Sequence, residues 1–469
     1  MLWWVQSLLT GGLLLMQKGS AVVLNVIDSS APPARNIRWL VCLLLFFATT
    51  INYLDRSVLS LIEPLLHLPF MGWIPGVGAP YQFTYHLHYG HIVECFQIAY
   101  GIGLLTASPL IDRFGTKKGY ALAIVVWAFA SLGHSVVGSV MGFCIARAML
   151  GLGESGNFPA AIKAITEWFP TEERALATGL FNSGANAAFF IAPALIPIVT
   201  LRFGWRAAFL FTGSLGFLWL IVWLIFPYYR LCRDLTATQK NLQNVIPQVT
   251  GFLLWGPLLR TRGLYAFALA KGLTDPVWWF YLFYLPMFLN DTYGLDLRHA
   301  YWPLVSVYAV SSVGSIVGGS LSGILMRRGF SVNQARKLTL LAMAVCVLPI
   351  MLVPHMHVLF PNNAWPAIAL FSLAAAAHQG WSANLFSTPT DMFPSSAVST
   401  VVGMGGAVGS AGGAAFTWFV SRYFSLHPMF IFLMASLAYL TALAIFQILV
   451  PKLRVSADEQ FQEALSRPF

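Results

Sequence analysis

Residues 166–179 read TEWFPTEERALATG, and residues 390–403 read TDMFPSSAVSTVVG. Both stretches contain a threonine, an acid, a Phe-Pro pair and a glycine nine residues after the proline, and the second lies 224 positions after the first. A second matching pair is DRFGTKKG (112–119) and MRRGFSVNQARK (326–337). These matches indicate two copies of one unit, an arrangement typical of membrane transporters that move one half against the other.

The composition indicates an integral membrane protein. Of the 469 residues, 58% are hydrophobic and 9% are charged, with a mean hydropathy of +0.71, whereas a soluble domain carries roughly 25% charged residues. Four of the five cysteines lie in apolar segments and one lies in a basic loop, which indicates neither a disulfide framework nor a zinc site. We therefore expect no metal and no cofactor.

Twelve apolar runs are long enough to cross a bilayer as helices of about 20 residues. They fall at 38–60, 91–111, 119–138, 141–164, 176–199, 206–227, 264–287, 301–325, 338–355, 365–388, 398–420 and 429–450. The sequence thus predicts an all-α integral membrane fold with twelve transmembrane helices in two six-helix halves. We expect an N-terminal extension without an assigned role (1–35), a first bundle (36–227), a linker (228–260), a second bundle (261–455) and a tail (456–469).

The distribution of basic residues orients these spans. With both termini inside, the inner segments hold nineteen Lys and Arg residues and the outer segments hold four, which satisfies the positive-inside rule. The net charge of +10 is then a consequence of topology and does not indicate a nucleic-acid partner. We expect a multi-pass protein of the cell (inner) membrane with both termini in the cytoplasm.

Two charged residues fall inside the fourth span, although a charge at the bilayer centre costs about 2.5–3.5 kcal/mol. Arg147 and Glu154 are seven residues apart, so they project from one face of a helix, about 10 Å apart along its axis. Arginine can hold a carboxylate by two parallel hydrogen bonds, and burial favours the protonated form of Glu154, which suits a proton carrier. The alternative is a structural ion pair between Arg147 and an acid.

The first span contains NYLDR (52–56), in which two opposite charges are adjacent. Tyr53 and Arg56 are three residues apart and share a helix face, whereas Asp55 points to a different sector. We expect Arg56 to face a substrate cavity and Asp55 to face another helix of the same half. The alternative for Asp55 is a structural partner of Arg147, and the two roles are compatible if that pair breaks during a transport cycle.

Polar and aromatic side chains in other spans suit a polyhydroxylated ligand. Amides and hydroxyls can bond its hydroxyl groups, and an indole can stack on a sugar ring. Packing is the alternative for the polar residues of span two, for one of the tryptophans and for the histidine, and helix–helix hydrogen bonds are the alternative for the two asparagines of span five. Four polar side chains within seven residues of span ten favour a cavity. The candidate substrate contacts are Gln97 and Tyr100 in span two, Asn182 and Asn186 in span five, Trp278 and Trp279 in span seven, and His378, Gln379, Ser382 and Asn384 in span ten.

Four further features carry expectations about structure. Asp275-Pro276 predicts a helix break in span seven, and GMGGAVGSAGG (403–413) predicts a helix-packing surface rather than a ligand site. The second-half counterpart of IDRFG (111–115) has no acid, which predicts a weaker gating ion pair there. Segment 67–90 is predicted to be an outer loop. The spacing of its histidines and of the histidine that follows it matches no standard zinc pattern; these residues are His67, His86, His88 and His91.

Several motifs resemble a known family. PLIDRFGTKKG (109–119) resembles the loop signature of the major facilitator superfamily. INYLDRSV (51–58), the segment from ARAMLG to FNSG (146–184) and LTDPVWWFYLFYLP (273–286) resemble its anion:cation symporter family, and within it the bacterial hexuronate transporters. The resemblance implies substrate contacts at Tyr53, Arg56 and Arg147, and it implies that Asp55 and Glu154 take part in proton coupling.

Residues and resemblance together predict a secondary active transporter rather than an enzyme. We expect proton-coupled uptake of a hexuronate, such as glucuronate or galacturonate, by alternating access, so that the partners are a small organic anion, protons and the lipid bilayer. A symporter of another organic anion, such as an aldonate or a dicarboxylate, is the alternative. A membrane-embedded enzyme would need a catalytic cluster near one interface, and a nutrient receptor usually needs a long signalling tail; neither is evident in the sequence.

Overall fold

The computed structural model describes residues 35–62, 79–228, 251–295, 301–423 and 428–453, which are helical apart from short connections. The first half comprises α2 (Arg35–Ile62), α3 (Ala79–Phe114), α4 (Thr116–Gly133), α5 (Val140–Glu154), α6 (Asn157–Trp168), α7 (Thr171–Phe203) and α8 (Trp205–Ile225). The second half comprises η3 (Gly251–Leu254), α11 (Trp255–Leu259), α12 (Arg262–Tyr293), α13 (Tyr301–Arg327), α14 (Val332–Val347), η4 (Leu348–Leu352), α15 (Val353–Leu359), α16 (Trp365–Met392), α17 (Val398–Tyr423) and α18 (Pro428–Leu449).

All twelve predicted spans coincide with these helices. Span four consists of two helices, α5 and α6, and span nine consists of α14, η4 and α15. By length and composition alone, seven helices in the described part of the chain are long and apolar enough to cross a membrane. The predicted outer loop at 67–90 ends earlier than expected, because α3 already begins at Ala79.

Local sequence signals set several of the helix boundaries. Gly115 and Gly204 adopt positive φ angles of 83° and 86° and separate α3 from α4 and α7 from α8, a conformation that glycine adopts without steric cost. Ser331 caps α14 in a reciprocal capping box with Gln334, which satisfies backbone donors that the first helical turn leaves without partners. Within each of the pairs α3–α4 and α7–α8, a single glycine therefore separates the helices.

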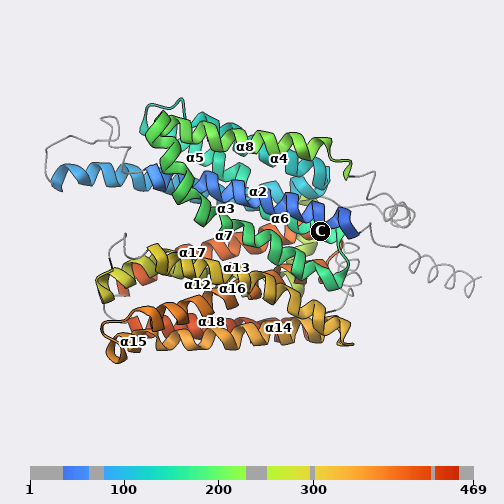
Figure 1. Ribbon diagram of the computed structural model, residues 1–469. Coiled ribbons are helices and arrows are strands. Elements are labelled where there is room, and N and C mark those ends of the chain that lie inside the picture. Colours follow the sequence, from blue (N-terminus) through green and yellow to red (C-terminus); the bar gives the residue numbers. More distant parts are fainter. Residues whose placement is uncertain (1–34, 63–78, 229–250, 296–300, 424–427, 454–469) are drawn as a thin grey trace, which may run out of the picture.

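The two halves lie as two layers in Figure 1, with α2 to α8 in one layer and α12 to α18 in the other. They repeat each other in detail. The Lys117 ammonium donates to the carbonyls of Leu224 and Phe226 at the C-terminal end of α8, and Lys337 donates to the carbonyls of Val450 and Pro451 after α18. In both halves a lysine thus neutralises the negative end of the last helix, as expected of a duplicated unit.

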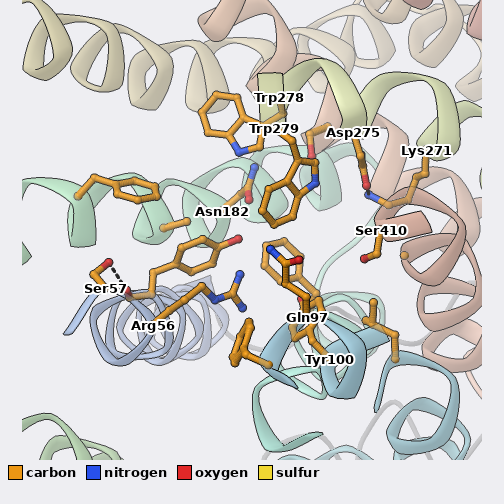
Figure 2. Close-up of a pocket in the computed structure, with 18 of the residues that line it drawn as sticks. Arg56, Ser57, Gln97, Tyr100, Asn182, Lys271, Asp275, Trp278, Trp279 and Ser410 are labelled. Carbon is orange, nitrogen blue, oxygen red and sulfur yellow. Dashed lines mark hydrogen bonds and ion pairs between the residues drawn. The ribbon is translucent and has the colours of Figure 1, made fainter. Parts of the chain in front are cut away.

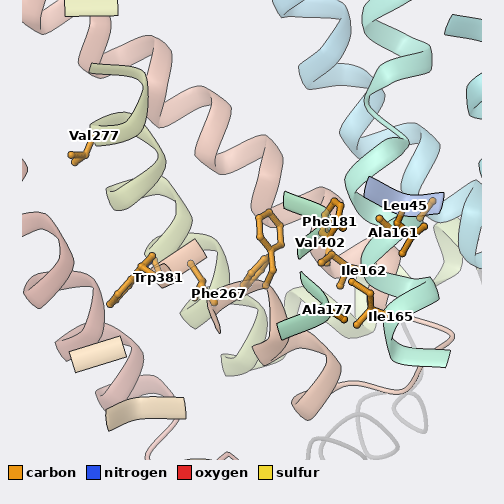
Figure 3. Close-up of a cluster of buried hydrophobic side chains, with 14 of the residues drawn as sticks. Leu45, Ala161, Ile162, Ile165, Ala177, Phe181, Phe267, Val277, Trp381 and Val402 are labelled. Carbon is orange, nitrogen blue, oxygen red and sulfur yellow. The ribbon is translucent and has the colours of Figure 1, made fainter. Parts of the chain in front are cut away.

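The start of α2 marks one end of the bundle, at the right of Figure 1. We call it the basic end because it holds Arg113, Lys117, Arg174 and Arg327. The halves pack closely toward this end. Ser315 of α13 donates to the Gly179 carbonyl of α7 at 2.9 Å. A buried hydrophobic cluster continues from the first half into the second (Figure 3).

Charged residues also join the halves at the basic end. Asp112 of α3 accepts hydrogen bonds from the Thr400 amide and hydroxyl of α17, both at 2.7 Å, and pairs with Lys163 at 2.7 Å. Thr400 lies in the first turn of α17, where backbone amides and the helix dipole favour an anion. This contact fastens the first half to the start of α17.

A second charged cluster corrects the expectation of a weaker gating pair in the second half. The acid missing from the loop is supplied by Asp391 of α16, which pairs with Arg336 at 2.8 Å. Arg336 also donates to the Thr171 carbonyl of the first half at 2.9 Å, and Arg174 donates to the Thr390 carbonyl at 2.8 Å. Asp391 belongs to the repeated TDMFP motif, so the buried ion pair of the second half uses a different part of the duplicated unit.

The predicted helix break at Asp275-Pro276 is wrong, because α12 runs without interruption from Arg262 to Tyr293. Proline removes one backbone hydrogen bond, and membrane helices tolerate this where a neighbour packs closely. Here a Cβ atom on Gly412 of α17 would lie 2.5 Å from the Gly272 carbonyl, the group that Pro276 cannot bond. The small residues of α17 therefore allow α12 to stay continuous.

Candidate binding site

A cavity of about 480 Å³ lies between the halves, within the size range of small-molecule sites. Helices α2, α3, α5, α6 and α7 of the first half and α12, α16 and α17 of the second contribute to its walls. Along α2 it reaches from Tyr53 to Ser60, that is, toward the end of α2 at Ile62 and away from the basic end. The cavity therefore approaches the surface at the end of the bundle opposite the charged contacts.

Arg56 projects into this cavity from α2 (Figure 2). Its Nε and Nη2 atoms donate to Glu154 Oε2 at 3.1 and 2.9 Å. Its guanidinium lies 4.6 Å from the Tyr53 ring centroid, 5.0 Å from Phe96 and 4.9 Å from Tyr100, distances at which ring faces attract a cation. The Glu154 side chain is fully buried while that of Arg56 is 21% exposed, so the arginine faces the cavity and the acid lies behind it.

Asp55 points away from the cavity, although it is adjacent to Arg56 in the sequence. Its Oδ1 atom accepts a hydrogen bond from Ser131 of α4 at 2.7 Å, and Ser131 lies 3.3 Å from the Thr212 hydroxyl of α8. Asp55 thus faces other helices of its own half, as the spacing in NYLDR suggested. The roles of both residues remain predictions.

Arg147 of α5 is 3% exposed and lines the cavity. It interacts electrostatically with both Asp55 and Glu154. The acid paired with Arg56 is Glu154, so the two acids and two arginines form one cluster at the wall of the first half. A proton or an anion that enters this cluster changes the electrostatic balance of all four groups.

Most of the other predicted contacts line the cavity. They are Tyr53, Gln97, Tyr100, Asn182, Trp278, Trp279, His378, Gln379 and Ser382. Asn182 of the first half donates to the Gln379 side chain of the second at 2.6 Å. The Trp278 indole stacks on the His378 ring with centroids 5.0 Å apart, and a ring nitrogen of His378 lies 2.6 Å from the Tyr439 hydroxyl. One of the two tryptophans is thus engaged in packing at the cavity wall.

Two predicted contacts do not line the cavity. Asn384 is fully buried and donates to the Gly318 and Gly380 carbonyls at 2.7 and 2.9 Å, so its amide joins α13 to α16. Asn186 is fully buried as well and lies outside the cavity wall. Asn384 therefore makes helix–helix hydrogen bonds, because close glycine contacts bring the carbonyls within reach.

An ion pair that was not predicted from the sequence lines the cavity in the second half. On α12, the Lys271 ammonium lies 2.8 Å from Asp275 Oδ2 and 4.1 Å from the Phe386 ring centroid. The available signal was a cation and an acid four residues apart in an apolar run, a spacing that makes helix neighbours. The glycine-rich part of α17 packs against α12 as expected, and Gly406 and Ser410 of the same segment also line the cavity.

Among the described residues, no group of three or more His, Cys, Asp and Glu side chains could hold a metal ion. His67 lies outside the described part of the chain, as do the side chains of His86 and His88. The N-terminal extension at 1–34 and the tail from 454 onward also lie outside it.

Comparison with known proteins agrees with this architecture. Residues 45–417 match the family model described as Major Facilitator Superfamily. The chain is 31% identical over 387 residues to the hexuronate transporter of Escherichia coli (strain K12), covering 79% of this chain and 84% of that transporter. It is 28% identical over 360 residues to the galacturonate transporter of Dickeya chrysanthemi, covering 73% and 96% of the two chains.

A solved structure shares the fold at low sequence identity. The proton:xylose symporter XylE superposes with a TM-score of 0.71 at 15% identity, covering 92% of this chain and 99% of that one. The family match spans most of the sequence, and the relatives it resembles are transporters rather than enzymes. This chain, with its two six-helix halves around a central cavity, therefore belongs to the major facilitator superfamily of membrane transporters.

Proposed function

We propose that the protein is a proton-coupled symporter of a hexuronate, such as glucuronate or galacturonate. The observation that carries the proposal is the Arg56 guanidinium, which faces the cavity and is held by Glu154. Its forked donors match a carboxylate in geometry. Amide groups at Gln97, Asn182 and Gln379 offer hydrogen bonds to hydroxyls elsewhere in the cavity. The similarity to transporters named for hexuronate and galacturonate supports the same substrate class.

Coupling follows from competition for one arginine. The Nε and Nη2 atoms that bond Glu154 are donors that a substrate carboxylate needs. When Glu154 binds a proton it loses the charge that holds Arg56, and the arginine becomes available to the substrate. Asp55 and Arg147, which interact electrostatically, add a second acid and a second cation beside this exchange. Proton and substrate thus enter together without touching each other.

Alternating access then requires the halves to separate at the basic end. The protein lies in the cell (inner) membrane, and by the positive-inside rule its basic end faces the cytoplasm. Both termini are then on the cytoplasmic side. The cavity reaches toward the opposite end, so with this orientation we infer an outward-facing state. Opening inward breaks the Asp112–Thr400 and Arg336–Thr171 contacts. Closing the outer end covers the cavity beside Ser57 and Ser60.

Transport into proteoliposomes tests the proposal. Purified protein should concentrate labelled glucuronate when an inward proton gradient is imposed and should not concentrate glucose. Arg56→Ala should abolish uptake, whereas Glu94→Gln, an exposed acid outside the cavity wall, should behave as the unmodified protein. Glucuronate accumulation that is the same with and without the proton gradient would refute proton coupling. Equal competition by glucose and glucuronate would refute recognition of the carboxylate. Uptake of an aldonate or dicarboxylate instead of hexuronates would favour the alternative substrate class.

A further inference from the structure

We propose that the Lys271–Asp275 pair is the specificity element of the cavity: its carboxylate binds substrate hydroxyls and excludes sugar acids with a second carboxylate. The inference rests on the proposed function and deepens it. The pair belongs to α12 of the second half, and in Figure 2 it lies across the cavity from Arg56. A substrate held at its carboxylate by Arg56 therefore presents its other end to this pair.

The geometry of the pair decides which of its charges meets the substrate. The Lys271 ammonium contacts both carboxylate oxygens of Asp275, at 3.1 and 2.8 Å, and lies over the Phe386 ring. The Lys271 side chain is only 6% exposed, whereas that of Asp275 is 22% exposed. Both residues line the cavity, and the carboxylate is the more exposed of the two groups.

The carboxylate is also fixed in place. It packs against Gly409 of α17, where a side chain would collide with Asp275 Oδ2. Lysine four residues earlier on the same helix stabilises its ionised form. Lys271 is therefore a positioning residue, and Asp275 is the group that touches the substrate. Ser410, one residue beyond Gly409, adds a hydroxyl to the same part of the cavity wall.

A fixed carboxylate selects by hydrogen-bond chemistry. An ionised carboxylate is an acceptor only, with lone pairs left over after bonding one ammonium, and it forms strong, short bonds to hydroxyl donors. Sugar hydroxyls fit this requirement. A second carboxylate on the substrate brings no donor and places a like charge against Asp275, which is unfavourable.

Charge balance in the described part of the site points the same way. The cations Arg56, Arg147 and Lys271 are matched by the acids Asp55, Glu154 and Asp275. Protonation of one acid leaves one positive charge in excess. That excess suits one substrate carboxylate, so the site is built for a monoanion and not for a dianion.

The test compares glucuronate, which has one carboxylate, with glucarate, which has two. Binding to the full chain in detergent is measured by quenching of tryptophan fluorescence, since Trp278 and Trp279 line the cavity. The unmodified protein should bind glucuronate at least about tenfold more tightly than glucarate, the loss expected for one charged hydrogen bond. Asp275→Asn should weaken glucuronate and strengthen glucarate, each by about tenfold, because Lys271 then faces the cavity without its carboxylate.

Two further variants separate specificity from folding. The double variant Lys271→Met with Asp275→Asn removes both charges and should bind both ligands weakly, without the reversed preference. Glu94→Gln removes a carboxylate outside the cavity wall and should retain the original preference. A purely structural role of the pair would weaken both ligands in parallel and would not reverse their order.

The outcomes are distinguishable. Equal binding of glucuronate and glucarate by the unmodified protein overturns the inference while leaving the proposed function intact, and this measurement does not depend on any variant folding. A parallel loss of both ligands in Asp275→Asn also overturns it. Failure of the unmodified protein to bind either sugar acid refutes the proposed function itself.

Discussion

Replacing Asp112 by asparagine should shift the protein out of the state closed at the basic end. The Asp112 carboxylate accepts two hydrogen bonds from Thr400 across the interface between the halves, both at 2.7 Å. These bonds exist only while the halves meet at this end. Their loss therefore changes the balance between the two access states as well as the stability of the fold.

The magnitude follows from the charge of the acceptor. A hydrogen bond to a charged group contributes about 1.5–3 kcal/mol and a neutral one about 0.5–1.5 kcal/mol. Asparagine retains a neutral acceptor, so two weakened bonds cost the closed state roughly 2–3 kcal/mol, a factor of about 30 to 140 in the population ratio. Thr400→Val removes one of the two bonds outright, worth about 1.5–3 kcal/mol, and leaves the Asp112–Lys163 pair at 2.7 Å, so an effect of similar size is expected.

Distances between spin labels measure the shift. One pair of labels replaces the exposed residues Lys118 and Arg328 at the basic end, one on each half, in a cysteine-free background. A second pair replaces Leu201 and Val358, both exposed, at the opposite end. Asp112→Asn should increase the population of long distances at the basic end and of short distances at the other. An unchanged distribution at the basic end would refute the reasoning, as would long distances there in the unmodified protein.

Four further predictions follow from the described contacts. Arg147→Lys keeps the charge but loses the planar fork, so calorimetry should show glucuronate binding weakened by roughly 1.5–3 kcal/mol; unchanged affinity would mean that charge alone suffices. Asp55→Asn and Glu154→Gln mimic protonated acids, so each should exchange substrate in counterflow but fail to concentrate it with a proton gradient; accumulation by both would place the proton path elsewhere. A cysteine at Lys118 should react with an impermeant maleimide in inverted vesicles but not in intact cells, and the reverse pattern would contradict the orientation. Gly179→Val collides with a carbonyl oxygen of α13, so spin labels at the basic end should report separation of the halves; a distribution like that of the unmodified protein would show that the contact is yielding.

The sequence by itself determined the number of spans, their approximate ends and the duplication. These properties depend on local information: a helix that crosses a bilayer must be apolar over about 20 residues, and duplicated motifs keep their spacing. Sequence also identified the membrane charges in NYLDR and in the fourth span as unusual, because a charge in lipid is costly wherever its partner is. The different directions of Asp55 and Arg56 followed from helical periodicity alone.

Only the tertiary structure decided which of these side chains meet. Arg56 pairs with Glu154, 98 residues away, and no periodicity within either helix predicts that contact. The same holds for Asp391, which supplies the ion-pair acid that its own half lacks in the expected loop. Asn384 was predicted to contact the ligand, but its amide bonds helix carbonyls. Lys271 was not predicted as a site residue, but it lines the cavity. Whether a buried polar group meets a ligand, an ion partner or a backbone carbonyl depends on the angle and depth at which two helices cross, and that is set by packing across the whole bundle.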